Sequence, residues 1–93
     1  MDREQFLQLA GQMLEKNETR LRRKETNKGC FTLRQIFGRK AWNDIPKGER
    51  PERGVWFCAA VRSGRYSQIK AANEVNEHWH TLYEFVEKRV DEE

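Results

Sequence analysis

The sequence has no apolar run that approaches the ~20 residues of a membrane-spanning helix. Its N-terminal residues, MDREQF, are charged and lack the apolar segment of a secretory signal peptide. Only two cysteines occur, Cys30 and Cys58, which are too few for a disulfide framework. We therefore expect a cytoplasmic protein with no membrane partner, in which both thiols are reduced.

Motifs of catalysis and metal binding are missing as well. Cys30 and Cys58 form no C-x-x-C pair, and His78 and His80 are too close in sequence for a zinc-type histidine pair. Cys58 lies in the apolar stretch WFCAAV, where burial makes a thiol unreactive. Neither a G-x-S-x-G elbow nor a Walker-type phosphate loop is present. We expect no enzyme, no metal and no cofactor.

Charge is abundant, and it is unevenly distributed. The 93 residues suffice for one small domain with a modest core. Between Lys16 and Lys70, fifteen basic residues stand against five acidic ones, whereas the two ends together carry three basic and ten acidic residues. A basic middle between acidic ends favours an anionic partner. The alternative is an ordinary solvated charged surface.

A long amphipathic helix is predicted over residues 2–24. Asp2 is a suitable N-cap, and the last turns, RLRRK, place positive charge where the helix dipole favours it. Three leucines recur every seven residues on one face: Leu7, Leu14 and Leu21. This stripe offers a seam for a homodimer or for another partner.

A short second helix is predicted over residues 31–38. Thr32 is its expected cap, and Gly38 ends it. The following link is expected to be irregular, with Trp42 and Ile45 inserted into the core.

A third helix is predicted from Pro51 to about Arg62. Proline suits the first turn of a helix, because its missing N–H group would have no intrahelical partner there. The segment VWFCAAV is expected to be the buried body of this helix, Cys58 included.

Two strands are predicted to end the fold. Residues 67–75 and 78–87 alternate in the manner of a hairpin, although a helix over 77–90 is the alternative. The fold class is therefore α+β, with three helices followed by a β-hairpin, as in a winged helix-turn-helix domain. The single domain divides into the N-terminal helix, a winged-helix-like core over 31–87 and a polar tail over 88–93.

The segments FTLRQIF, IPKGER and GVWF, with Trp42 between the first two, carry a resemblance. Over residues 31–83 the chain resembles a small uncharacterised family of bacterial and phage domains, one of the numbered domains of unknown function. The resemblance implies a compact, winged-helix-like core and a bacterial or mobile-element origin. It implies no activity and no catalytic residue.

Basic residues around the third helix form the candidate nucleic-acid site. A helix N-terminus attracts phosphate through unpaired N–H groups, and arginine adds a planar, bidentate donor. The candidates are Lys47, Arg50, Arg53, Arg62, Arg65 and Lys70, together with Tyr66, which would stack on a base if exposed. Further cations on the N-terminal helix and beyond it would reach the backbone from the other side: Arg20, Arg22, Arg23, Lys24 and Lys28. The alternative is that these cations pair with Glu49, Glu52 and the acidic C-terminal tail.

The sequence thus predicts a non-catalytic DNA-binding accessory or regulatory protein, such as a regulator of transcription. It would contact the phosphates of duplex DNA through a basic face, in agreement with a phage or plasmid origin. The alternative is a protein-interaction module, for example a phage- or plasmid-encoded inhibitor of a host nucleic-acid enzyme.

Overall fold

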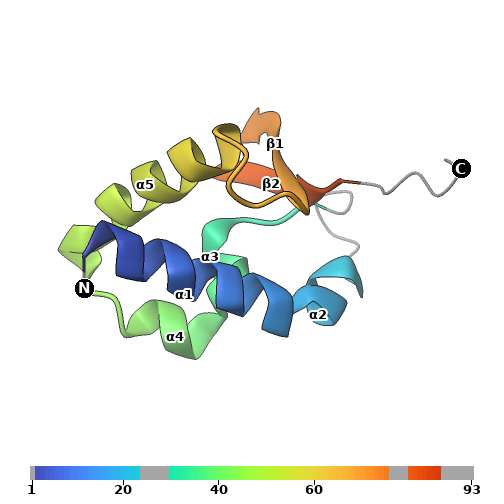
Figure 1. Cartoon of the computed structure of the whole chain (residues 1–93). Coiled ribbons are helices and arrows are strands. Elements are labelled where there is room, and N and C mark those ends of the chain that lie inside the picture. The colour runs from blue at the N-terminus through green and yellow to red at the C-terminus, as the bar shows by residue number, and fades with distance from the viewer. Residues whose placement is uncertain (1, 24–29, 76–79, 87–93) are drawn as a thin grey trace, which may run out of the picture.

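Five α-helices precede an antiparallel hairpin in the part of the chain that the computed structural model describes, residues 2–23, 30–75 and 80–86 (Figure 1). In chain order the elements are α1 (Arg3–Lys16), α2 (Glu18–Arg23), α3 (Leu33–Phe37), α4 (Arg39–Asn43), the 3-10 turn η2 (Lys47–Glu49), α5 (Arg50–Arg62), β1 (Ile69–Val75) and β2 (Thr81–Phe85). The predicted α+β class is confirmed. No helix among these residues is both long and apolar enough to cross a membrane. Several residues with sequence-based predictions lie outside the described ranges: Lys24, Lys28, His78 and the tail 88–93.

The predicted N-terminal helix is divided in two at Asn17. Asp2 begins α1 with a capping box, in which its side chain accepts from the Gln5 N–H group at 2.8 Å. Asn17 is the C-cap of α1, and α2 starts at the next residue. The expectation of one continuous helix over 2–24 was therefore wrong. Asn favours helix ends over helix interiors, because its side chain competes for backbone groups.

Helix α3 confirms the predicted second helix, with the predicted cap and stop. The Thr32 hydroxyl accepts from the Gln35 N–H group, and the Gln35 side chain accepts in turn from the Thr32 N–H group. Gly38 ends α3 with a φ of 86°, a left-handed conformation that glycine adopts without strain. The following link is not irregular as predicted, because residues 39–43 form α4 directly after this reversal.

Helix α5 confirms the predicted third helix, and it ends in a Schellman motif. Pro51 lies in its first turn. The Arg65 N–H group donates to the Ala60 carbonyl at 3.1 Å and the Gly64 N–H group to the Val61 carbonyl at 3.0 Å, with Gly64 at a φ of 90°. The chain thereby leaves the helix directly toward the hairpin.

Strand β2 forms backbone pairs along both of its edges, with β1 on one side and Phe31 on the other. Ala71 of β1 lies opposite Tyr83 of β2, and the register shifts between Ala71 and Val75. On the other edge, Phe31 bridges to Tyr83, with the Phe31 N–H group donating at 2.8 Å and the Tyr83 N–H group donating back at 2.7 Å. The strand over 81–85 agrees with the alternation in the sequence and excludes a helix there.

The core lies between α1, α3, α5 and the hairpin. Phe57 is its centre, with ring centroids 5.2 Å from Tyr66 and 4.9 Å from Tyr83, while Phe6 of α1 stacks on Phe37 of α3 at 5.5 Å. Trp42 is buried as predicted. The three stripe leucines are also buried in this core: Leu7, Leu14 and Leu21. They cannot form the predicted dimer seam, because their side chains already pack inside the same chain.

Only part of the segment VWFCAAV of α5, predicted to be buried, lies in the core. Its buried residues are Arg53, Phe57, Ala60 and Val61. Ala59 and Val55 of the apolar segment face solvent, and Cys58 is only half-buried. The aromatic partners of Phe57 decide which face turns inward, and apolar composition alone does not contain that information.

Tyr66 is buried, with only 6% of its surface exposed, so the condition for its predicted stacking on a base, that the ring is exposed, is not met. Its hydroxyl donates to the Leu7 carbonyl of α1 at 2.7 Å. This hydrogen bond and the ring contact with Phe57 anchor the start of the hairpin on α1. Tyr66 therefore belongs to the core and not to a binding surface.

Burial raises the pKa of Tyr66 from 10.0 to about 12. Between these values the folded chain holds a proton that the unfolded chain has lost, so this residue's contribution to stability falls as pH rises through the window. We expect Tyr66→Phe to lose about 1 kcal/mol at neutral pH through the missing hydrogen bond. Urea unfolding at about pH 8 and about pH 11 should show a smaller difference between the two proteins at the higher pH. A difference that is equal at both pH values would contradict this account.

Candidate functional site

The cations predicted at the start of α5 do not form one open cluster. Lys47 is exposed on η2. Arg50 is half-buried, donates from Nε to the Ile45 carbonyl at 3.0 Å and lies over the Trp42 ring at 5.6 Å. Its guanidinium group therefore contributes to the packing of the η2–α5 turn.

Arg53 is a buried ion-pair residue and not an exposed phosphate ligand. Only 7% of its surface is exposed. Its guanidinium group lies 2.7 Å from Glu49 and 3.3 Å from Glu52, and it packs over the rings of Trp56 at 4.6 Å and Phe6 at 5.6 Å. The pairing with Glu49 and Glu52, weighed as the alternative, is what the structure shows for this residue.

The remaining cations predicted near α5 also contact groups of the same chain. Arg65 donates two hydrogen bonds to Glu4, at 3.0 and 2.6 Å, and this pairing raises the pKa of Arg65 and lowers the pKa of Glu4. Lys70 lies 3.9 Å from Glu84 on the neighbouring strand. Arg62 donates from Nε to the Cys58 sulfur at 3.3 Å. Two of these three cations are therefore partly neutralised by carboxylates.

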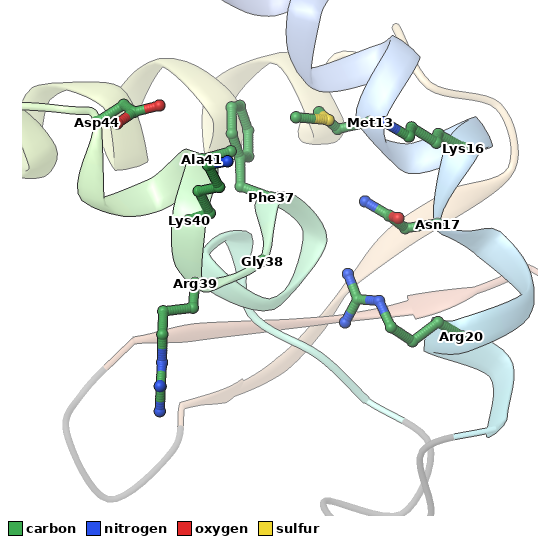
Figure 2. A pocket seen from close by; sticks show the side chains of 10 residues that line it. All are labelled: Met13, Lys16, Asn17, Arg20, Phe37, Gly38, Arg39, Lys40, Ala41 and Asp44. Atoms are coloured by element: carbon green, nitrogen blue, oxygen red, sulfur yellow. The ribbon is translucent and has the colours of Figure 1, made fainter.

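A hollow of about 550 Å³ lies elsewhere, between the α1–α2 corner and α4 (Figure 2). Apolar groups of Met13, Phe37 and Ala41 line it. Four basic residues line it as well: Lys16, Arg20, Arg39 and Lys40. We call this cavity, together with its four cations, the basic hollow. Figure 2 shows the Arg20 guanidinium group directed across the hollow toward Gly38, while Arg39 extends outward from α4.

Among the described residues, no ion pair neutralises the four cations of the basic hollow. Asp44 is the one carboxylate among the described residues of its lining. In the part of the chain that the structure describes, none of the four cations forms a salt bridge. Arg20 donates to the backbone carbonyl of Gln35, at 2.9 Å. A hollow lined by cations of one sign concentrates a positive potential that attracts anions.

Two side-chain hydrogen bonds build the hollow. The last carbonyls of a helix have no intrahelical partner. In α3 these carbonyls accept from the α1–α2 corner: Asn17 Nδ2 donates to Ile36 at 2.8 Å, and Arg20 donates to Gln35. The reversal at Gly38 then starts α4, so that Lys40 lies across the hollow from Lys16, with Arg39 on the outer side of α4.

Three members of the basic hollow were missed at the level of sequence. Lys16, Arg39 and Lys40 were counted only as part of the basic middle, because the segment of α4 was taken for an irregular link. The available signal was the pair of Asn17 and Gly38, a helix-ending residue and a residue suited to chain reversal, each directly beside a cation.

The fold and the hollow define a small α+β domain with a basic surface. The model of the family described as a domain of unknown function, DUF1413, matches residues 17–84, and the chain belongs to this family. The predicted resemblance to a numbered domain of unknown function is thereby confirmed. The match contains most of the basic hollow, from Asn17 through α4. No curated protein and no solved structure matches the chain.

Replacing Asn17 by Ala should destabilise the fold, because it removes a hydrogen bond and leaves the Ile36 carbonyl without its donor. We expect a loss of about 1 kcal/mol in the free energy of unfolding. Thr19→Ala, at an exposed position of the neighbouring helix, is the matched control and should stay within about 0.5 kcal/mol of the wild type. Equal stabilities of the two variants in urea unfolding would show that the corner hydrogen bond contributes nothing.

Replacing Arg53 by Ala should be more damaging than any change at Lys47. The variant loses two ion pairs and the packing between Phe6 and Trp56, and we expect a cost of about 2 kcal/mol. Lys47→Ala should change stability by less than about 0.5 kcal/mol. Thermal unfolding of both variants checks this, and an Arg53→Ala protein as stable as the wild type would contradict the buried role.

Proposed function

We propose that this protein is a non-catalytic accessory or regulatory protein that binds duplex DNA through phosphate contacts at the basic hollow. The observation that carries the proposal is the gathering around one hollow of four cations that form no salt bridge with the described residues. The cations predicted near α5, in contrast, mostly have partners within the chain. Phosphate contacts dominate the affinity of such proteins and carry little sequence information.

The order of elements supports a winged-helix interpretation of the fold. Helices precede an antiparallel hairpin, and the bridge between Phe31 and Tyr83 ties that hairpin to the segment before α3. In this interpretation α5 corresponds to the recognition helix and the hairpin to the wing. The outward face of α5 nevertheless carries Glu52, Val55 and Ala59, with Arg62 as its basic residue. We therefore assign the phosphate contacts to the α1–α4 side of the domain.

A protein partner with an acidic surface is the second candidate. The apolar lining at Met13 and Phe37 suits a side chain as well as it suits a sugar or a base. This candidate predicts no binding to a random duplex at low salt, whereas the first predicts binding that weakens steeply with salt. A fluorescence-anisotropy titration therefore distinguishes the two.

The wild-type protein should bind a random duplex at ~50 mM salt and lose roughly 100-fold in affinity at ~200 mM, since four phosphate contacts give a log–log salt slope of roughly −3 to −4. The double variant Arg39→Glu, Lys40→Glu should weaken binding by at least about tenfold and flatten the slope by about 2. Absence of binding by the wild type at the lower salt concentration would refute the DNA proposal.

A matched control separates the site from the overall charge. Lys47→Glu combined with Lys70→Glu changes the net charge by the same amount at positions outside the hollow. It should weaken binding by no more than about threefold, because distant exposed charges are screened. An equal loss in both double variants would move the contact surface away from the hollow.

A further inference from the structure

The outward face of α5 carries a stripe of solvent-exposed residues. Its members recur at spacings of three, four and three residues: Glu52, Val55, Ala59 and Arg62. The opposite face of the same helix is buried in the core. Val55 is 67% exposed, the highest fraction of any large hydrophobic residue in the described part of the chain. Residues at this spacing lie along one side of a helix and form the seam when two helices pack together.

The charges at the two ends of the stripe have opposite signs. Glu52 lies in the first turn of α5 and Arg62 in the last. Glu52 is exposed and contacts Arg53, which has a shorter ion pair with Glu49, at 2.7 Å. Arg62 is exposed and forms no salt bridge with the described residues; its Nε donates to the Cys58 sulfur, and this bond leaves its terminal N–H groups available. Both groups retain the capacity to pair across an interface.

The stripe is complementary to itself in one orientation only. If two copies of α5 pack antiparallel about a two-fold axis at the level of Phe57, Glu52 faces the partner's Arg62. Val55 then faces the partner's Ala59, whose small side chain permits a close approach. A parallel pair would instead place each charge opposite its like. The antiparallel arrangement also sets the two helix dipoles in favourable opposition.

We propose that a second copy of this chain docks on this stripe, and that the protein forms an antiparallel α5–α5 homodimer. The proposal stands apart from the DNA proposal, because it uses neither the hollow nor its cations. In Figure 1, α5 and α4 lie on opposite sides of α1, so docking on α5 leaves the hollow open. A dimer would thus present two basic hollows to one polyanion, which raises avidity without a new contact.

The expected dimer is weak. A single pair of helices buries less than the roughly 1,000 Å² that a stable complex needs. We expect monomers at ~10 µM and a substantial dimer population at ~1 mM, which corresponds to a millimolar to submillimolar dissociation constant. Sedimentation-velocity or small-angle scattering measurements over this range show whether a dimer forms.

Charge reversal tests the geometry of the dimer. Val55→Glu should keep the protein monomeric at ~1 mM, because it buries two carboxylates at the seam. Glu52→Arg and Arg62→Glu should each reduce the dimer fraction, and the double variant Glu52→Arg, Arg62→Glu should restore it, since the opposed pairs reform with exchanged signs. Circular dichroism melting checks that the variants fold, and Arg53 keeps its pair with Glu49 in all of them.

Lys40→Glu is the control, because it lies in the basic hollow and should leave the dimer unchanged while weakening DNA binding. A wild-type monomer at ~1 mM would overturn the homodimer proposal. A dimer that survives Val55→Glu, or a double variant that fails to recover the dimer, would overturn it too. None of these outcomes depends on whether the protein binds DNA.

Discussion

The candidate site depends on two hydrogen bonds that join the α1–α2 corner to the end of α3. Asn17 and Arg20 donate to the Ile36 and Gln35 carbonyls, which would otherwise lack partners because their helix ends there. These contacts fix the position of the end of α3, where the chain reverses at Gly38. The direction of α4, and with it the position of the cations opposite the corner, follows from that anchor. The helix break at Asn17 therefore determines the position of the basic hollow.

The fold divides its cations into two groups with different roles. Near α5 and the hairpin, Arg53 and Arg65 have carboxylate partners, and their guanidinium groups connect elements of the same chain. Arg65 joins the start of the hairpin to Glu4 of α1. Around the hollow, Lys16 and Lys40 have no such partner in the described structure. Net charge alone cannot separate these groups, and only unpaired cations are available to an external anion.

The sequence predicted the positions of the helices and strands better than it predicted which of their faces are buried. Local rules were sufficient for the Thr32 cap of α3 and for the first turn of α5 at Pro51, since both depend on neighbouring residues only. They were not sufficient to predict the helix break at Asn17, because a helix of this composition tolerates an Asn in its interior. The partner of the Asn17 side chain is the Ile36 carbonyl, which lies far away in the sequence. Arg53 shows the same limit for the site. Its burial depends on an aromatic ring from α1, far away in the sequence.

The central claim is that anions meet this domain at the hollow and not at α5. An NMR titration of the labelled protein with a duplex of one helical turn, about 10 base pairs, tests it most directly, since such a duplex accommodates a single copy. The account predicts that the backbone amide signals of residues 16–20 and 38–41 shift as duplex is added, and that those of residues 52–62 stay in place. Shifts confined to residues 47–65, with the corner and α4 unchanged, would contradict it.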